Sequence, residues 1–142
     1  MNERIEQILN EMDRYMPAGT MYDFLYVHRK MVRFNIYLSK KEMEEDITAL
    51  DISVRANHCL KRAGYQTVGA LVKAISAKEE DSSKQQLLRV RSLGKKTAEE
   101  ILLMLMCYQF KVLPEAEKRQ FVLEIVEMNL GNGGTQYIEV PG

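Results

Sequence analysis

The stretch Arg89-Val-Arg-Ser-Leu-Gly-Lys-Lys-Thr97 contains the most informative structural signal in the protein. It places the end of a short helix, a Leu-Gly turn and the N-terminus of a new helix in succession. Glycine lets a turn backbone approach a phosphate closely, and the free N–H groups at a helix N-terminus favour an anion. Lys95, Lys96 and Thr97 add positive charge and a hydroxyl donor there. The stretch therefore predicts a helix-hairpin-helix element, although Gly-Lys-Lys also occurs at ordinary exposed helix starts.

Two capped helices are predicted before this stretch. Ser53 can cap a helix that runs from Val54 to Ala63, and Gly64 supplies the left-handed residue that commonly ends a helix. Thr67 can cap the next helix, whose apolar face would hold Val68, Leu71, Val72 and Ile75.

A polar run and two further helices complete this half of the protein. Residues 76–86 show no apolar periodicity, which predicts a solvated loop, either without regular structure or with a nascent helical turn. A long helix from about Thr97 to Phe110 is expected to bury Ile101, Leu105 and Tyr108. Pro114 breaks it, and a last helix over 115–129 would bury Phe121, Ile125 and Met128. The tail, residues 131–142, is expected to be mobile.

The first 46 residues are predicted to form an all-helical arm. Residues 3–15 show helical spacing of Ile5, Ile8, Leu9, Met12 and Met16. Thr20 and Asp23 make a capping box for a second helix reaching about Asn35, with a buried side of Phe24, Leu25, His28, Met31 and Val32. A lone histidine on such a face is expected to be a packed core residue. Ser39 and Glu42 make another capping box, which predicts a short helix through Ile47.

Composition and charge limit the classes of function. The net charge of zero sums a basic middle, in which residues 51–106 carry 10 Lys/Arg against 6 Asp/Glu, and two acidic flanks. Local basic charge permits phosphate binding but does not prove it, because a solvated helical surface can look the same.

No apolar run is long enough for a membrane helix, and the charged N-terminus does not resemble a signal peptide. A cytoplasmic protein is expected, with neither a disulfide nor a metal site at Cys59 and Cys107.

A second string carries a specific resemblance. Residues 47–71 read ITALDISVRANHCLKRAGYQTVGAL. Together with Arg89–Thr97, this string resembles the C-terminal domain of the bacterial RNA polymerase alpha subunit. That family has an I-x-x-L-x-L-S-V-R start, an N-C-L-K-R-A-G continuation, a T-V-x-x-L-V helix and an L-L-K-x-x-N-L-G-K-K-S end. The resemblance implies an all-α fold, a compact four-helix module with helix-hairpin-helix elements over residues 47–110. The arm of residues 1–46 and a helix over 111–130 would flank it.

The resemblance also implies a DNA site. Arg55 matches the arginine that enters an A/T-rich minor groove, a role suited to a guanidinium because that groove has enhanced negative potential. An arginine at this capped helix start gains nothing from the helix dipole. Cys59 matches the family cysteine near the groove wall, although it could equally be a small core residue. The other matches are Arg89 with the basic residue before the hairpin, Gly94 with the hairpin glycine, Lys96 with a phosphate-contacting lysine and Thr97 with the serine or threonine at the helix start. His58 departs from the pattern, because the family has asparagine there. The polar run of residues 76–86 is longer than its family counterpart, and Arg91 adds charge beside the hairpin.

Three classes of function remain in competition. The first is a DNA-binding module associated with transcription, with double-stranded DNA and RNA polymerase or transcription regulators as partners. The second is a protein-binding adaptor or decoy that engages RNA polymerase or its regulators while its DNA contact is vestigial, which His58 favours. The third, an enzyme, is not expected, because the sequence shows no catalytic constellation and no sign of a cofactor. Residues 1–46 do not resemble the assembly domain of an alpha subunit. A stand-alone relative is therefore expected, with residues 1–46 packing on the module or forming a homodimer.

Overall fold

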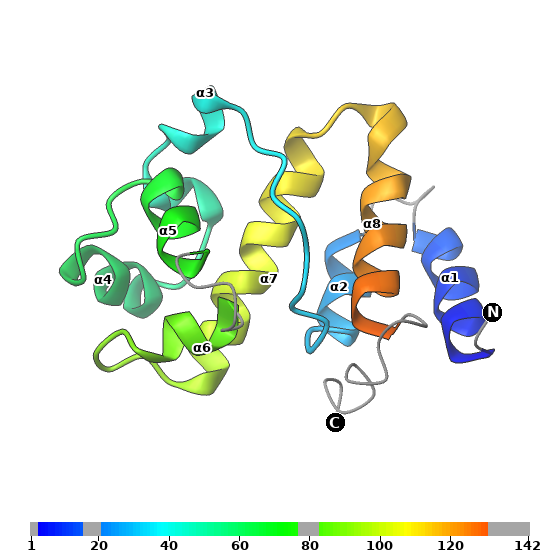
Figure 1. Cartoon of the computed structure of the whole chain (residues 1–142), viewed down its shortest axis with the longest axis horizontal. Coiled ribbons are helices and arrows are strands. Elements are labelled where there is room, and N and C mark those ends of the chain that lie inside the picture. Colours follow the sequence, from blue (N-terminus) through cyan, green and yellow to red (C-terminus); the bar gives the residue numbers. More distant parts are fainter. Residues whose placement is uncertain (1–2, 16–20, 77–82, 131–142) are drawn as a thin grey trace. The chain divides into compact units, whose positions relative to one another are not determined.

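The computed structural model describes residues 3–15, 21–76 and 83–130. These residues form eight α-helices, one 3-10 helix and no β-strand, which confirms the predicted all-α fold. The protein divides into two units (Figure 1): unit 1 comprises residues 1–35 and 113–142, and unit 2 comprises residues 36–112. The expected boundary of the N-terminal arm, after residue 46, therefore differs from the boundary between the units. The expected mobile tail lies outside the described residues.

Unit 1 contains α1 (Glu3–Tyr15), α2 (Met21–Val27) and α8 (Glu115–Leu130). The predicted apolar face of α1 is confirmed, because Ile5, Ile8 and Met12 are buried. That face packs against α2 and α8. Arg119 of α8 also donates to the Asp13 carboxylate over 2.8 Å. The partners of α1 are therefore α2 and the last described helix of the same protein, and burial of its apolar face requires no second copy.

The predicted second helix, up to Asn35, is wrong in its length. The helix α2 ends at Val27, a turn follows, and Met31–Ser39 is not helical. The buried Asn129 side chain accepts the Arg33 N–H over 3.2 Å and donates to the Arg33 carbonyl over 2.9 Å. Since these bonds satisfy the backbone of Arg33, a helix is not required there. Phe24, Leu25, Met31 and Val32 are buried as predicted, and His28 is half-buried. Thr20 lies outside the described residues.

The first part of unit 2 follows the predicted caps. Glu42 accepts the Ser39 N–H over 2.9 Å at the start of α3 (Lys40–Met43). That helix stops after one turn, short of the predicted end, and the 3-10 helix η1 (Ile47–Leu50) follows, capped by Asp46. Hydrogen bonding to Thr48 lowers the pKa of Asp46 to about 2. An isolated bridge joins Asp46 to Thr67, so this segment lies beside the N-cap of α5 (Val68–Ile75).

The remaining helices of unit 2 are α4 (Val54–Arg62), α5 (Val68–Ile75), α6 (Ser83–Leu88) and α7 (Lys95–Val112). Ser53 and Thr67 cap α4 and α5, and Gly64 has a φ of 96°, as predicted. Of the two alternatives for residues 76–86, the one with a helical turn agrees with the structure, because α6 begins at Ser83. Residues 77–82 lie outside the described ranges. Leu87 anchors α6 in the core with 1 % exposure. Periodicity could not reveal so short a helix, because it has little more than one turn.

Gly69 is the position where a substitution should test the packing of unit 2. A Cβ at Gly69 would lie 2.8 Å from the Met43 carbonyl oxygen. Gly69→Ala should therefore destabilise the protein by about 1 kcal/mol, since crowding of roughly 1–3 kcal/mol exceeds the gain of up to about 1 kcal/mol in helix propensity. Urea unfolding measures the change. Lys73→Ala, at an exposed position of the same helix, should leave the midpoint unchanged, and an unchanged midpoint for Gly69→Ala would contradict the close approach.

Among the helices that the structure describes, none is both long and apolar enough to cross a lipid bilayer.

Candidate nucleic-acid interface

The hairpin between α6 and α7 is the centre of the candidate site. Val90 N–H donates to the Leu87 carbonyl over 2.9 Å, and Leu93 N–H donates to the Val90 carbonyl over 3.2 Å. Leu93 is buried and anchors the turn in the core of the unit. Ser92, with a φ of 68°, is the left-handed residue of this turn. The backbone thus reverses direction at Ser92, one step earlier than the predicted Leu-Gly turn.

Gly94 is the N-cap of α7. Its carbonyl accepts the Ala98 N–H over 2.9 Å, and its φ is not positive. The residue is exposed, and a Cβ built on it would meet nothing within 4 Å. Neither the backbone conformation nor the packing of the fold therefore requires glycine here. Because glycine has no side chain, a partner molecule can approach the backbone closely at this position.

The first turn of α7 gathers charge beside Gly94. The helix begins at Lys95, two residues before the predicted start, so Lys95, Lys96 and Thr97 supply its first N–H groups. The two lysines are exposed, and Thr97 is half-buried. The N-terminal turn of an 18-residue helix carries partial positive charge that adds to the two ammonium groups. This end of α7 can accept an anion such as a phosphate.

The N-terminus of α4 contributes the second part of the site. Ser53 Oγ accepts the Ala56 N–H over 3.1 Å, so the serine hydroxyl caps this helix. Arg55 follows in the first turn and is exposed. His58, three residues later, is also exposed and lies on the same side of the helix. These two residues project from the surface of unit 2 and can contact a partner.

Two long-range contacts hold α4 to the hairpin and to α7. The Ser53 N–H donates to Glu100 Oε2 of α7 over 2.8 Å. The Cys59 thiol of α4 lies 3.9 Å from the Ser92 carbonyl oxygen in the hairpin. Cys59 has 6 % exposure, so it acts as a core residue that spaces α4 from the turn. Through these contacts the N-termini of α4 and α7 belong to one local surface.

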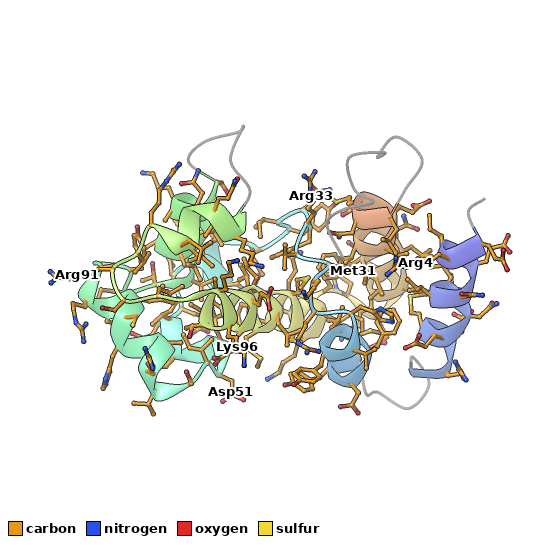
Figure 2. The ribbon with its side chains drawn as sticks, turned by 90° about the horizontal axis from the view of Figure 1, so that it is seen from below. Arg4, Met31, Arg33, Asp51, Arg91 and Lys96 are labelled. Atoms are coloured by element: carbon orange, nitrogen blue, oxygen red, sulfur yellow. The ribbon has the colours of Figure 1, made fainter. Side chains whose placement is uncertain are left out.

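Basic residues dominate the exposed part of this surface. Arg89 precedes the hairpin, where it donates to the Gln86 side chain over 3.0 Å. Figure 2 shows Arg91 extending outward from the turn and Lys96 at the start of α7. Exposed cations outnumber the carboxylates here: Glu99 accepts from Lys84 over 2.6 Å, Glu100 accepts from the Ser53 backbone N–H, and Asp51 is exposed. The local field therefore favours a polyanion.

Sequence reasoning identified the exposed cations of this site but missed Glu100 as the group that joins its two halves. Glu100 lies 47 residues from Ser53 in the sequence, and no local pattern connects these residues. The only available signal was the placement of both residues within about one turn of a predicted helix N-terminus.

The candidate sites considered next are a metal site and a reactive thiol. The described ranges contain no group of three or more His, Cys, Asp or Glu residues that could hold a metal ion. Burial raises the pKa of the Cys107 thiol to about 11, so this thiol is a poor nucleophile at neutral pH.

Comparison with known proteins identifies the central region. Residues 37–106 match the family model of the C-terminal domain of the bacterial RNA polymerase alpha subunit. The DNA-directed RNA polymerase subunit alpha of Carboxydothermus hydrogenoformans is 35 % identical over 85 residues, covering 56 % of this protein and 25 % of the relative. The same subunit of Symbiobacterium thermophilum is 43 % identical over 61 residues, covering 43 % of this protein and 17 % of the relative. The matched region thus spans a quarter or less of the length of these relatives. No solved structure matches this protein.

Proposed function

Since residues 37–106 form a domain like the C-terminal domain of the bacterial RNA polymerase alpha subunit, we propose that unit 2 binds double-stranded DNA in association with transcription. The observation that carries the proposal is the joining of two capped helix N-termini through Ser53 and Glu100. In this proposal Arg55 and Lys96, both exposed, contact the duplex from these two helix N-termini. A duplex offers a matching pair of features, a groove and the phosphates that border it.

Each part of the surface has a distinct role in this proposal. The Arg55 guanidinium enters a narrow A/T-rich minor groove, where the negative potential is greatest. The His58 imidazole replaces the hydrogen-bonding asparagine of the family pattern beside it. The backbone at Gly94 and the first turn of α7, with Lys96 and Thr97, bind a phosphate, and Arg89 contributes charge next to the hairpin. Cys59 acts from within the core by spacing α4 from the turn.

A titration of the protein with A/T-rich and G/C-rich duplexes tests the proposal directly. Fluorescence anisotropy at two salt concentrations should show tighter binding to the A/T-rich duplex and weaker binding to both duplexes at higher salt. Absence of binding to either duplex at low salt would overturn the proposal.

Lys96→Ala should weaken binding to all duplexes about equally. Loss of one phosphate contact should reduce the slope of log K against log salt by about one unit. Lys73→Ala is the matched control, because Lys73 is an exposed lysine on α5 and no proposed role is assigned to it. A change in sequence preference in Lys96→Ala would contradict a phosphate-binding role.

A protein-binding adaptor is the second candidate function. His58 favours it, because this exposed imidazole occupies the position at which the family pattern has asparagine. An adaptor of this kind would bind RNA polymerase or its regulators and leave DNA unbound. If wild type binds neither duplex and His58→Asn does, then loss of DNA binding at His58 would support the adaptor function.

A further inference from the structure

A small pocket lies in unit 1, in a part of the protein that the DNA-binding proposal does not use. Its volume is about 190 Å³. The start of α1, the turn after α2 and the end of α8 supply its lining: Arg4, Ile8, Val27, His28, Arg29, Lys30, Met31 and Leu130. Arg4 and Met31 are labelled in Figure 2. The lining combines aliphatic residues with basic ones.

The charged residues that line this pocket have one sign. Every charged or titratable residue in the lining is basic: Arg4, His28, Arg29 and Lys30. A carboxylate outside the lining, that of Glu11, places both of its oxygens 3.2 Å from His28 Nε2. The sequence of unit 1 as a whole is acidic, with 7 Lys/Arg against 10 Asp/Glu. The positive charge is therefore a local property of the pocket.

An exposed apolar patch continues from the pocket along α2. The rings of Tyr22 and Tyr26 stack with centroids 6.0 Å apart, and each residue is 47 % exposed. Val27, 57 % exposed, belongs to both the patch and the pocket. The Arg29 guanidinium lies 4.6 Å from the centre of the Tyr26 ring and donates to the Tyr26 carbonyl over 3.0 Å. These contacts hold the guanidinium in place beside the patch before any partner arrives.

We propose that this face binds an acidic peptide segment of a partner protein, with one apolar side chain in the pocket. Carboxylates of that segment would then pair with Arg29 and Lys30 at the rim, and its backbone would lie along Tyr22 and Tyr26. Tyrosine and arginine are among the residue types most enriched where protein interfaces derive much of their binding energy. A partly ordered arginine also lowers the entropy lost on pairing with a carboxylate.

Size and charge favour this occupant over two others. Pockets that enclose a small organic ligand usually measure about 300–1,000 Å³, so this one suits a single side chain. A nucleic acid contacts many phosphates at once, and the net negative charge of the unit opposes such an extended polyanion. A short acidic segment needs only the local cations. The proposal is independent of DNA binding by unit 2.

A panel of short acetylated peptides provides the test. Each octapeptide carries one Leu, Met, Phe or Tyr followed by two Glu, with the fluorophore at the far end, and is titrated with the full-length protein by anisotropy. At least one peptide should bind. Replacing both Glu by Gln, or the apolar residue by Ser, should weaken that peptide at least tenfold, a loss of about 1.4 kcal/mol.

Two variants separate the site from general charge effects. Arg29→Glu and Val27→Asp alter exposed residues, so both should keep the wild-type circular dichroism, and each should weaken the best peptide at least tenfold. Arg14→Glu makes the same charge change at an exposed position of α1 outside the pocket and should keep wild-type affinity.

Four results would overturn the proposal. The first is the absence of binding by any peptide at about 1 mM, which corresponds to roughly −4 kcal/mol. The second is wild-type peptide affinity in both Arg29→Glu and Val27→Asp. The third is full competition by acetate or phosphate at the peptide's own concentration, which would indicate a site for small anions. The fourth is competition by duplex DNA that Arg29→Glu abolishes, which would indicate a nucleic-acid site.

Discussion

Arg55→Ala is expected to weaken binding to A/T-rich duplex by about 1–3 kcal/mol and to G/C-rich duplex by much less. A narrow A/T-rich groove concentrates negative potential on the guanidinium, whereas the amino groups of guanine obstruct its entry into a G/C-rich groove. Anisotropy titrations with both duplexes at one salt concentration measure the difference. The stability of the protein should hardly change, because Arg55 is exposed and gains nothing from the N-terminal end of a helix dipole.

Arg62→Ala is the matched control for this variant. It removes an exposed arginine from the last turn of the same helix, α4, and so changes the net charge by the same amount. Its effect should be small and equal on the two duplexes. Equal losses in Arg55→Ala would mean that Arg55 contacts phosphate only, and wild-type affinity for both duplexes would remove the minor-groove role.

Gly94→Ala should reduce affinity for both duplexes at least tenfold, about 1.4 kcal/mol. Its methyl group would enter the space through which a phosphate reaches the first turn of α7. In the free protein that space is open, since a Cβ at Gly94 meets nothing within 4 Å. Stability should fall by less than about 1 kcal/mol, the typical difference between these residues at an N-cap. Urea unfolding and anisotropy on the same samples separate the two effects.

Gly69→Ala is the natural comparison for Gly94→Ala. The same methyl group at Gly69 would meet the Met43 carbonyl oxygen at 2.8 Å, within the protein itself. This variant should therefore lose stability and keep its affinity for DNA under conditions in which it is folded. If Gly94→Ala also kept wild-type affinity, the hairpin would not approach a phosphate closely.

Local signals predicted most helices of this protein and many of their ends. Ser53 and Thr67 cap helices because their hydroxyls accept backbone N–H groups a few residues away, and Gly64 has the left-handed conformation that ends α4. The span of α1 was predicted in full from its apolar spacing. Such features depend on atoms within about one helical turn, so the amino-acid order contains what is needed to predict them.

The wrong prediction of a helix up to Asn35 has a non-local cause. The segment after α2 has helical apolar spacing, yet Asn129 binds the backbone of Arg33 from 96 positions away, and Gln109 accepts the Tyr37 N–H over 2.7 Å from 72 positions away. Both amide-bearing residues are completely buried, so unpaired amides there would be costly. That cost favours an extended segment over the helix that periodicity predicts.

The candidate site shows the same division. By itself the sequence determined the residue types: a helix capped by Ser53 with Arg55 in its first turn, a glycine before two lysines, and a basic middle region. Only the tertiary structure decided that Ser92 makes the turn, that Cys59 is a buried spacer and that Glu100 joins the two helix N-termini. Caps and charges act over a few residues, whereas a shared surface depends on contacts between residues tens of positions apart, which form only when the protein has folded.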